Sequence, residues 1–444
     1  MKFILIGAGS MAFSQSLISA IGCTPEFRGC TVGLVDVNEE SLDIMKRLTN
    51  RLVREMDWDI NFEASTDRRE LLPGADAVAV TIAVGGFDAY EKDILIPTKY
   101  GYVQSVGDTT GPGGLIRAMR HVPVMMDIAR DVKELCPGAR FYNYTNPMTI
   151  LTQAVNRIYP ATGLCMGPEL TKQDFCRFAD IDEDGVTYYV AGLNHCHVLL
   201  SIHKDGKDLY PIGRQKIRDI LSTPGGRESY PESIRAHWRD IPFNARLMDV
   251  MGYLPGPMDN HVMEYFPQFI NSNDRQRKEY PCNQSYYNSV LEHHPKKMAF
   301  YRGIADGTEP INKEDFTRQT GEETELISIE LALRSDKPKL FHLNIPNKDY
   351  ISDIPNGIPV EIPVFVDEHG YHPVAVGALP AAFAPTVARA TAKFDLTIDA
   401  ALEGCRSKVM QVFLNDPACN DIDIAEKCLN EMIDAQLKWL PNFK

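Results

Sequence analysis

FILIGAGSMA, residues 3–12, is the stretch that decides the fold of this chain. An apolar run that suits a buried strand leads into a glycine turn, and a helical pattern of apolar residues continues through Ile21. Gly7 permits the tight turn, Gly9 lets the backbone approach a pyrophosphate, and Ala12 allows the helix to pack closely on the strand. The turn and the helix N-terminus therefore predict a dinucleotide site.

A second predicted strand, residues 31–35, ends in Asp36. A carboxylate there can accept hydrogen bonds from both ribose hydroxyls and would repel the 2′-phosphate of NADP, so NAD is the expected cofactor. A chance strand–turn–helix is the alternative, but strand, turn, helix and terminal acid all agree. A later apolar run, residues 77–82, leads to another glycine turn that could approach the cofactor. The predicted cofactor-binding residues are Gly7, Gly9, Ser10, Met11, Asp36, Val84 and Gly85.

Strand and helix patterns alternate through the first part of the chain, which indicates α/β with a Rossmann-type doubly wound parallel sheet, as in lactate and malate dehydrogenases. This NAD-binding domain is predicted over residues 1–190. Residues 191–444 are less regular and are expected to form a C-terminal α+β lobe for substrate and metal binding and for oligomerisation. The glycine-rich stretch 101–114 is expected to be a loop, either at the substrate site or plainly on the surface.

Composition narrows the possible partners. The net charge of −14 argues against nucleic acid and against an anionic membrane, so a small molecule is the expected partner. The 10 cysteines form no CxxC pair, which is typical of a reduced cytoplasmic protein. No signal peptide is apparent, and no apolar run approaches the ~20 residues that a membrane span needs. We therefore expect a soluble, cytoplasmic protein.

A series of motifs in a distinctive order resembles glycoside hydrolase family 4, the NAD- and metal-dependent glycosidases. After the opening glycine turn they are TTGPGG (109–114), NYTNP (143–147), GLC (163–165), GLNH (192–195), VEIP (360–363) and GALP (377–380). QSVGD (104–108) is most similar to members acting on non-phosphorylated α-glycosides of the uronic-acid type, the α-galacturonidases and α-glucuronidases.

The resemblance implies a mechanism outside the usual two-carboxylate scheme. NAD takes a hydride from C3 of the sugar, which makes the C2 proton acidic, and a base removes that proton as the C1 substituent leaves. Water then adds, and the retained NADH returns its hydride. A divalent metal, usually manganese, bridges the sugar's O2 and O3 as a Lewis acid. Family members are commonly homodimers or homotetramers, and self-association is expected on that ground.

The resemblance also assigns residues. Cys165 and His195 match the metal ligands, although without the motifs a buried cysteine and a hydrogen-bonded core histidine would be the simpler interpretation. His197 alternates with His195 along a predicted strand and is expected to be structural. The C2 base falls in residues 258–265, where His261 lies nearest the position and Asp259 and Tyr265 are rivals.

The predicted substrate-binding residues are Asn146, Asp108 and Arg275. Phosphosugar-specific members carry an arginine where this chain has Tyr90, so a non-phosphorylated sugar is expected. Its carboxylate or sulfonate would be read by Arg117, Arg120 or Arg275. The bland alternative is that each arginine is a surface or structural residue.

One departure from the family pattern concerns the general acid. Met166 stands after the metal cysteine, where a polar residue is usual, and its thioether cannot donate a proton. Glu169 or another acid would have to serve, or the leaving group departs with little assistance. Two rival functions remain open from the sequence: an NAD-dependent dehydrogenase of a sugar or 2-hydroxy acid, and a catalytically inactive NAD-binding sensor.

Overall fold

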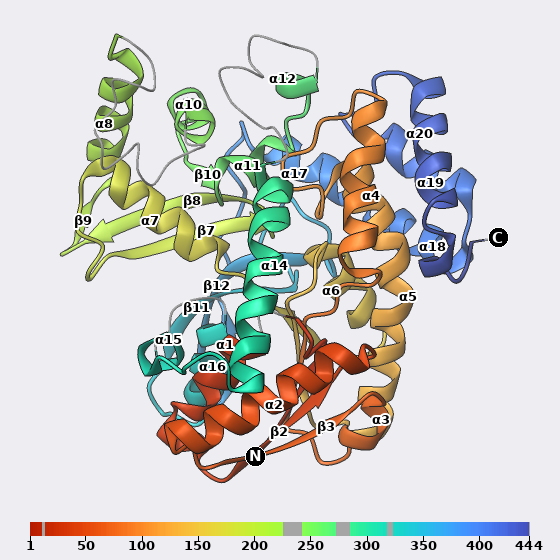
Figure 1. The fold of residues 1–444 in the computed structure, drawn as a ribbon. Coiled ribbons are helices and arrows are strands. Elements are labelled where there is room, and N and C mark those ends of the chain that lie inside the picture. Colours follow the sequence, from red (N-terminus) through yellow and green to blue (C-terminus); the bar gives the residue numbers. More distant parts are fainter. Residues whose placement is uncertain (11–13, 225–241, 272–284, 318–322, 444) are drawn as a thin grey trace.

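A computed structural model describes residues 1–10, 14–224, 242–271, 285–317 and 323–443. Six parallel strands form the first part of its sheet in the order β3-β2-β1-β4-β5-β6, the order of a dinucleotide-binding fold (Figure 1). The predicted Rossmann-type sheet is confirmed. These strands are β1 (Lys2–Ile6), β2 (Cys30–Val35), β3 (Ile60–Ser65), β4 (Ala77–Val80), β5 (Arg140–Asn143) and β6 (Ala161–Gly163).

The sheet does not stop at β6. Antiparallel strands extend it in the order β6-β11-β12-β7-β8-β10, so the described residues hold one continuous 13-stranded sheet. The added strands are β7 (Thr187–Leu193), β8 (Cys196–Lys204), β9 (Lys207–Asp208), β10 (Pro255–Gly256), β11 (Lys339–Pro346), β12 (Pro359–Asp367) and β13 (Gly370–Pro373). Residue 190, the predicted domain boundary, falls inside β7, and the division into two domains stays a prediction.

Helices cover both faces of the parallel part. They include α1 (Ser14–Gly22), α2 (Glu39–Met56), α3 (Arg68–Leu71), α5 (Gly111–Leu135) and α6 (Met148–Asn156). Helix α4 (Gly86–Lys99) packs on α5 and α20 (Ile422–Asp434), and α7 (Gly167–Ala179) packs on α8 (Tyr210–Ser222) and on β8 and β10 of the antiparallel part. The ends of α2 show why these helices begin and end where they do. The Asn38 side chain accepts a hydrogen bond from the Ser41 amide, and Asp57 ends the helix in the left-handed conformation.

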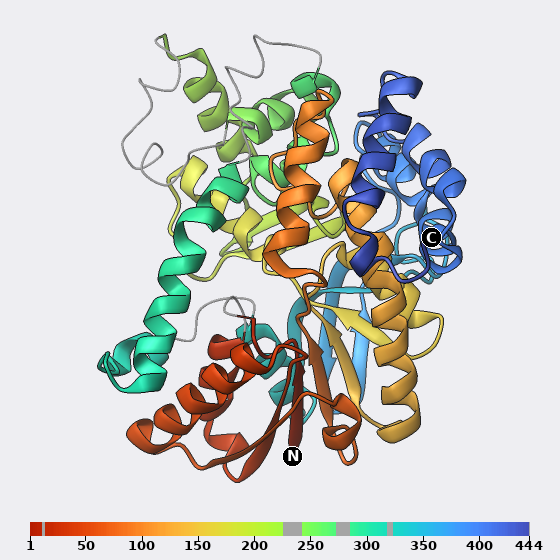
Figure 2. The ribbon, with the colours of Figure 1, turned by 45° about the vertical axis from the view of Figure 1, so that its right-hand side comes forward.

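The remaining helices build the rest of the C-terminal lobe. Those between β9 and β11 are α8 (Tyr210–Ser222), α10 (Pro242–Met251), α11 (Asp259–Met263), α12 (Gln268–Asn271), α14 (Ser285–Asp306), α15 (Lys313–Thr317) and α16 (Glu323–Ala332). The last four are α17 (Ala384–Thr391), α18 (Phe394–Glu403), α19 (Arg406–Leu414) and α20 (Ile422–Asp434). Helices α18 to α20 pack against α5, while the C-terminal end of α14 packs on α2 (Figures 1 and 2).

Two helices differ from the sequence expectation. Helix α4 was not predicted, because Gly86 at its start and Pro97 near its end interrupt the helical pattern. Helix α5 begins at Gly111, inside the stretch predicted as a loop. Pro112 stands in its first turn, where a proline is favourable because the amide it lacks would have no partner.

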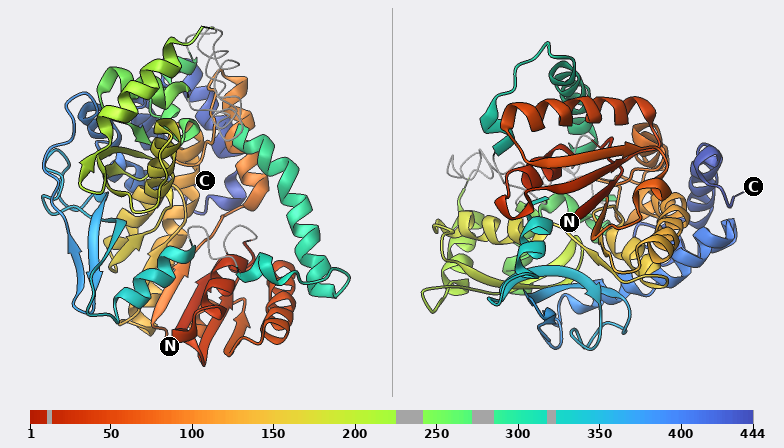
Figure 3. Two further views of the ribbon diagram at one scale, coloured as in Figure 1. Left: turned by 90° about the vertical axis from the view of Figure 1, so that its left-hand side faces the viewer. Right: turned by 90° about the horizontal axis from the view of Figure 1, so that it is seen from below.

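The carboxyl ends of the parallel strands point toward the side where the C-terminal lobe lies (Figure 3). Sheets of this kind bind ligands at that edge. Among the described residues, no helix is both long and apolar enough to cross a membrane.

Candidate active site

The glycine turn after β1 is packed as a dinucleotide site requires. Gly7 has a φ of +94°, and a Cβ atom there would lie 2.8 Å from the backbone of Thr81. The amides of Gly7 and Ala8 both donate to the carbonyl of Val35, each at 2.9 Å. Only glycine fits this turn, which joins the ends of three neighbouring strands.

Asp36 lies beside this turn. Its Oδ2 accepts a hydrogen bond from the Gly9 amide at 2.8 Å, and its Oδ1 accepts one from the Asn38 amide at 2.8 Å. Each carboxylate oxygen keeps a further lone pair that a ribose hydroxyl could use. The Ser10 amide donates to the Gly7 carbonyl at 2.9 Å, and Met11 lies outside the described residues.

Side chains of α5 hold the segment that follows β4 through hydrogen bonds to its backbone. The Val84 amide donates to His121 at 3.0 Å, and its carbonyl accepts from Arg120 at 2.9 Å. Gly85 follows with a φ of +81° and precedes α4. Arg120 is fully buried and forms an ion pair with Asp93. It is therefore a structural residue and does not bind the substrate.

Cys165 and His195 come together although 30 residues separate them. Cys165 follows β6, and His195 lies in the turn between β7 and β8. Both are buried, and Cys165 Sγ lies 3.6 Å from His195 Nε2. Ligand bonds of about 2.0–2.3 Å place two donors of one metal ion about 3.0–3.6 Å apart. The pair therefore fits one divalent ion.

The backbone and neighbours of these two residues fix their direction. The Gly167 amide donates to Cys165 Sγ at 3.3 Å, and Thr109 Oγ1 lies 3.0 Å from His195 Nδ1. His195 has a backbone φ of +61°, a left-handed conformation that residues other than glycine adopt rarely. Burial lowers the pKa of His195 well below its usual value, which keeps the imidazole in the neutral form that binds metals.

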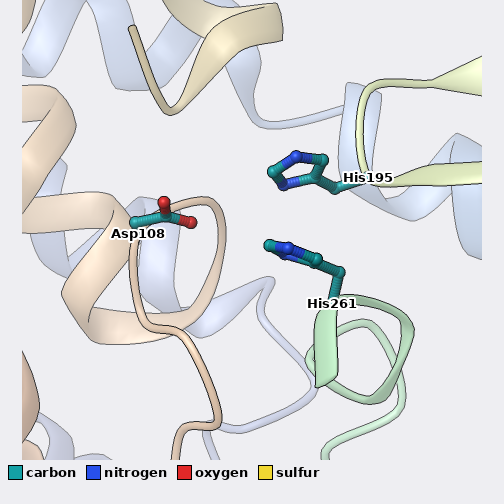
Figure 4. A group of neighbouring side chains, drawn as sticks. All are labelled: Asp108, His195 and His261. Atoms are coloured by element: carbon teal, nitrogen blue, oxygen red, sulfur yellow. The ribbon is translucent and has the colours of Figure 1, made fainter. Parts of the chain in front are cut away.

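Asp108 and His261 complete the group around His195. One ligand atom from each of these three residues lies within 4.8 Å of the others. Figure 4 shows the Asp108 carboxylate facing the two imidazole rings, whose centroids are 3.9 Å apart. Asp108 comes from the loop before α5 and His261 from α11.

Two polar atoms at this place lack a partner among the described residues. Asn146 Nδ2 donates to Asp108 Oδ2 at 3.1 Å, but Asn146 Oδ1 is buried without a hydrogen bond. His261 Nδ1 is also buried without one. Because buried polar groups are normally paired, these two atoms mark where a polar ligand would bind.

The two rivals of His261 have hydrogen-bond partners of their own. Asp259 is buried, and its carboxylate accepts hydrogen bonds from the amides of Phe243 and Asn244, both at 2.9 Å. It therefore caps α10 at its N-terminal end. Tyr265 donates to the Asn194 carbonyl at 3.4 Å, and burial raises its pKa well above the usual value, so its phenol stays protonated. His261 is the one of the three whose ring contacts that of His195 in Figure 4, and the choice of base stays a prediction.

The other residues named from the sequence differ in their hydrogen-bond partners and in whether the structure describes them. Tyr90 is buried and donates to the Val106 carbonyl at 2.7 Å, and Arg117 donates to the Asn146 carbonyl at 2.9 Å. Glu169 accepts hydrogen bonds from Lys172 and Tyr188. Arg275 lies outside the described residues. Arg117 is thus the described arginine that stands next to the predicted substrate residues.

Glu264 was not among the predicted site residues. Its Oε1 accepts hydrogen bonds from the amides of Val106 and Gly107, at 2.8 and 2.7 Å, and so holds the loop that carries Asp108. Burial raises its pKa to about 8. Its position three residues after His261 was the available signal, but nothing in the sequence places it against residues 106–107, which lie more than 150 positions away.

Comparisons with known proteins agree on one family. The model of the family described as "Family 4 glycosyl hydrolase" matches residues 2–181, and that of its C-terminal domain matches residues 190–419. An alpha-galactosidase of Bacillus subtilis is 29% identical over the whole of both chains. An alpha-galacturonidase of the same species is 28% identical over 97% of this chain and 96% of its own.

A solved structure has the same fold. It is described as a 6-phospho-alpha-glucosidase from gut microorganisms in complex with NAD and Mn2+, and it is 20% identical to this chain. The two superpose with a TM-score of 0.84 over all of this chain and 99% of that one. At this identity the likeness establishes the fold alone.

Proposed function

Because the chain belongs to family 4 of the glycosyl hydrolases, we propose that it is an exo-glycosidase that hydrolyses α-linked, non-phosphorylated, acidic sugars with NAD and a divalent metal. The observation that carries the proposal is the Cys165–His195 pair, whose donor atoms lie 3.6 Å apart, in a chain that also has a packed dinucleotide turn after β1. The alpha-galactosidase and alpha-galacturonidase relatives support the anomer and the sugar class.

The residues present suit both cofactors. Gly7, Gly9 and Asp36 would hold the NAD pyrophosphate and ribose, and Cys165 and His195 would hold manganese or another divalent transition metal. A solved structure of the same fold was obtained with NAD and Mn2+. When bound, NAD would accept a hydride from C3 of the sugar, and the metal would withdraw charge from the neighbouring oxygens.

The chain's own residues then have separate tasks. Asn146 Oδ1 would accept a hydrogen bond from a sugar hydroxyl, since it has no partner among the described residues. His261 Nδ1 would take the C2 proton. Burial lowers the pKa of His261, so the ring is neutral and able to accept a proton, and the nearby Asp108 carboxylate stabilises the cation that results.

The charge around the site supports a non-phosphorylated acidic substrate. Tyr90 stands where a phosphate-binding arginine would be needed, and its hydroxyl is already used by the Val106 carbonyl. Arg117 supplies a cation beside Asn146. One arginine pairs well with one carboxylate, whereas a phosphate monoester would leave charge unpaired.

The test is release of p-nitrophenol from a panel of α-linked sugars: galactoside, galacturonide, glucuronide, 6-sulfo and 6-phospho derivatives. NAD, manganese and reductant are each omitted in turn. We expect release from a uronide or sulfo-sugar that needs both NAD and metal, with only trace NADH.

Two other outcomes would replace the proposal. NADH accumulating in proportion to a free sugar or acid, without release of p-nitrophenol, indicates a dehydrogenase. Binding of NAD without release or NADH formation indicates a sensor. The cytoplasmic location and the assembly into a dimer or tetramer stay predictions.

A further inference from the structure

A buried polar cluster lies behind the predicted metal ligands. It belongs to strands of the antiparallel part of the sheet and to the first turns of α7, and each member is at most 1% exposed. The members are Thr171, Asn194, His197, Asn344 and Glu361. The proposed function uses none of these side chains, although VEIP and GLNH are two of the motifs that identify the family.

Glu361 is the centre of the cluster. Its Oε2 lies 2.5 Å from His197 Nδ1, and its Oε1 accepts a hydrogen bond from Asn344 Nδ2 at 2.8 Å. Asn194 Nδ2 makes a longer contact of 3.5 Å to the same oxygen. Asn194 and His197 stand on either side of the hairpin turn that presents His195, so one carboxylate holds both sides of that turn.

The same cluster reaches the Cys165 turn by two routes. His197 Nε2 lies 2.8 Å from Thr171 Oγ1, which also lies 2.9 Å from the Gly167 carbonyl. The amide of Gly167 is the group that donates to Cys165 Sγ. Asn344, for its part, pairs in register with Gly163, two residues before Cys165. Glu361 therefore connects the two turns that carry the metal ligands.

The free-energy cost of burying the Glu361 carboxylate argues that this residue does more than stabilise the fold. A buried carboxylate contributes little net stability, because well-packed apolar residues of similar volume often serve as well. His195 also holds a left-handed conformation, which persists only where the surroundings fix it. Partners behind metal ligands commonly fix ligand direction in this way.

We propose that Glu361 is a positioning residue that sets the spacing and direction of Cys165 and His195 for the divalent metal. It acts through His197 and Asn194 on one side and through Asn344 and Thr171 on the other. This inference rests on the proposed function in so far as that function places a metal at Cys165 and His195.

The experiment measures metal binding directly in the full chain. Apparent Kd values for Mn2+ and Co2+ are determined by calorimetry, and the thiolate-to-cobalt absorption band reports the bond to Cys165. For Glu361→Gln we expect a Kd about 10- to 100-fold weaker and a weakened or shifted band, with the NAD Kd unchanged.

Glu330→Gln is the matched control. Glu330 is also a fully buried glutamate, and it accepts hydrogen bonds from Arg140 and Tyr142 away from the metal ligands. The same substitution there should leave metal Kd and band unchanged. A merely structural role for Glu361 would give the two variants the same metal Kd.

Thr171→Val decides the question if Glu361→Gln does not fold. It removes one hydroxyl from the cluster, and we expect a metal Kd about 2- to 10-fold weaker. Wild-type Kd and band in every variant that folds would overturn the inference and leave the proposed function standing. A wild-type protein without the thiolate band would overturn both.

Discussion

The parallel and antiparallel parts of the sheet both contain deeply buried strands, but these strands are built differently. In the parallel part, β4 consists of four small apolar residues, all buried. In the antiparallel part, β12 is mostly buried, yet it carries Glu361, the neighbouring β11 carries Asn344, and β8, two strands away, carries His197. The buried side chains of β1 and β4, which lead into the nucleotide turn, are all apolar, whereas the antiparallel part places a buried polar cluster behind the predicted metal ligands.

The difference follows from what each part is expected to bind. The nucleotide turn uses backbone amides, whose direction the apolar strands and a glycine already fix. The metal ligands are side chains, which keep rotational freedom unless a neighbour restrains them. Backbone recognition needs only a correct turn, while side-chain recognition needs a second set of polar residues behind it.

Removing the predicted metal ligand Cys165 should give the largest effect, because metal binding should be lost while NAD binding is kept. Cys165→Ser is expected to lose tight metal binding and to lower kcat by about 10³-fold or more, because the metal supplies several kcal/mol of charge stabilisation. The NAD Kd should stay unchanged, as measured by fluorescence titration. Cys176→Ser, at another buried cysteine, is the control. If Cys165→Ser binds the metal as tightly as the wild type, the Cys165 thiolate is not a metal ligand.

Changing the predicted base should affect chemistry without affecting either cofactor. His261→Asn is expected to lower kcat by about 10²- to 10³-fold, since general-base catalysis contributes on that order. Exchange of the C2 proton with D2O, followed by NMR, should slow by the same factor. His203→Asn serves as the control. A metal Kd weakened as much as in Cys165→Ser would instead make His261 a metal ligand.

The smallest effect is expected in the nucleotide part. Asp36→Ala removes the carboxylate that binds the Gly9 amide and faces the ribose site, so the NAD Kd should rise about 10- to 100-fold. Metal Kd and the cobalt band should not change. Asp43→Ala, an exposed acid on α2, provides the comparison. Loss of metal binding in Asp36→Ala would show that the two parts are not independent.

The sequence predicted the nucleotide part because its signals are local. An apolar run, a glycine turn and a terminal acid stand within 36 residues, and the structure brings Gly9 and Asp36 into contact. Even there, the glycines of residues 111–114 suggested a loop where the structure has the first turn of α5. Glycine and proline are compatible with both, and the packing of the turn decides between them.

The metal part was predicted only where the motif order indicated it. Cys165 and His195 were named from the resemblance, and the structure brings them to 3.6 Å. The polar residues behind these ligands could not be predicted from the sequence. Glu361 contacts His197, which lies 164 positions away, and it belongs to a strand whose pattern is mostly apolar. A sequence pattern shows that such a strand is buried, but it does not show which distant side chain a polar residue in it will meet.

The continuous sheet has a consequence for the timing of catalysis. Because β11 pairs directly with β6, the proposed cofactor turn and the proposed metal turns stand on one continuous sheet of the described residues. If the proposed function holds, the cofactor takes a hydride from the sugar and later returns it, so the two must stay aligned through every intervening step. A sheet shared by both sites would favour that alignment, and the outward and return transfers would then occur across a similar distance.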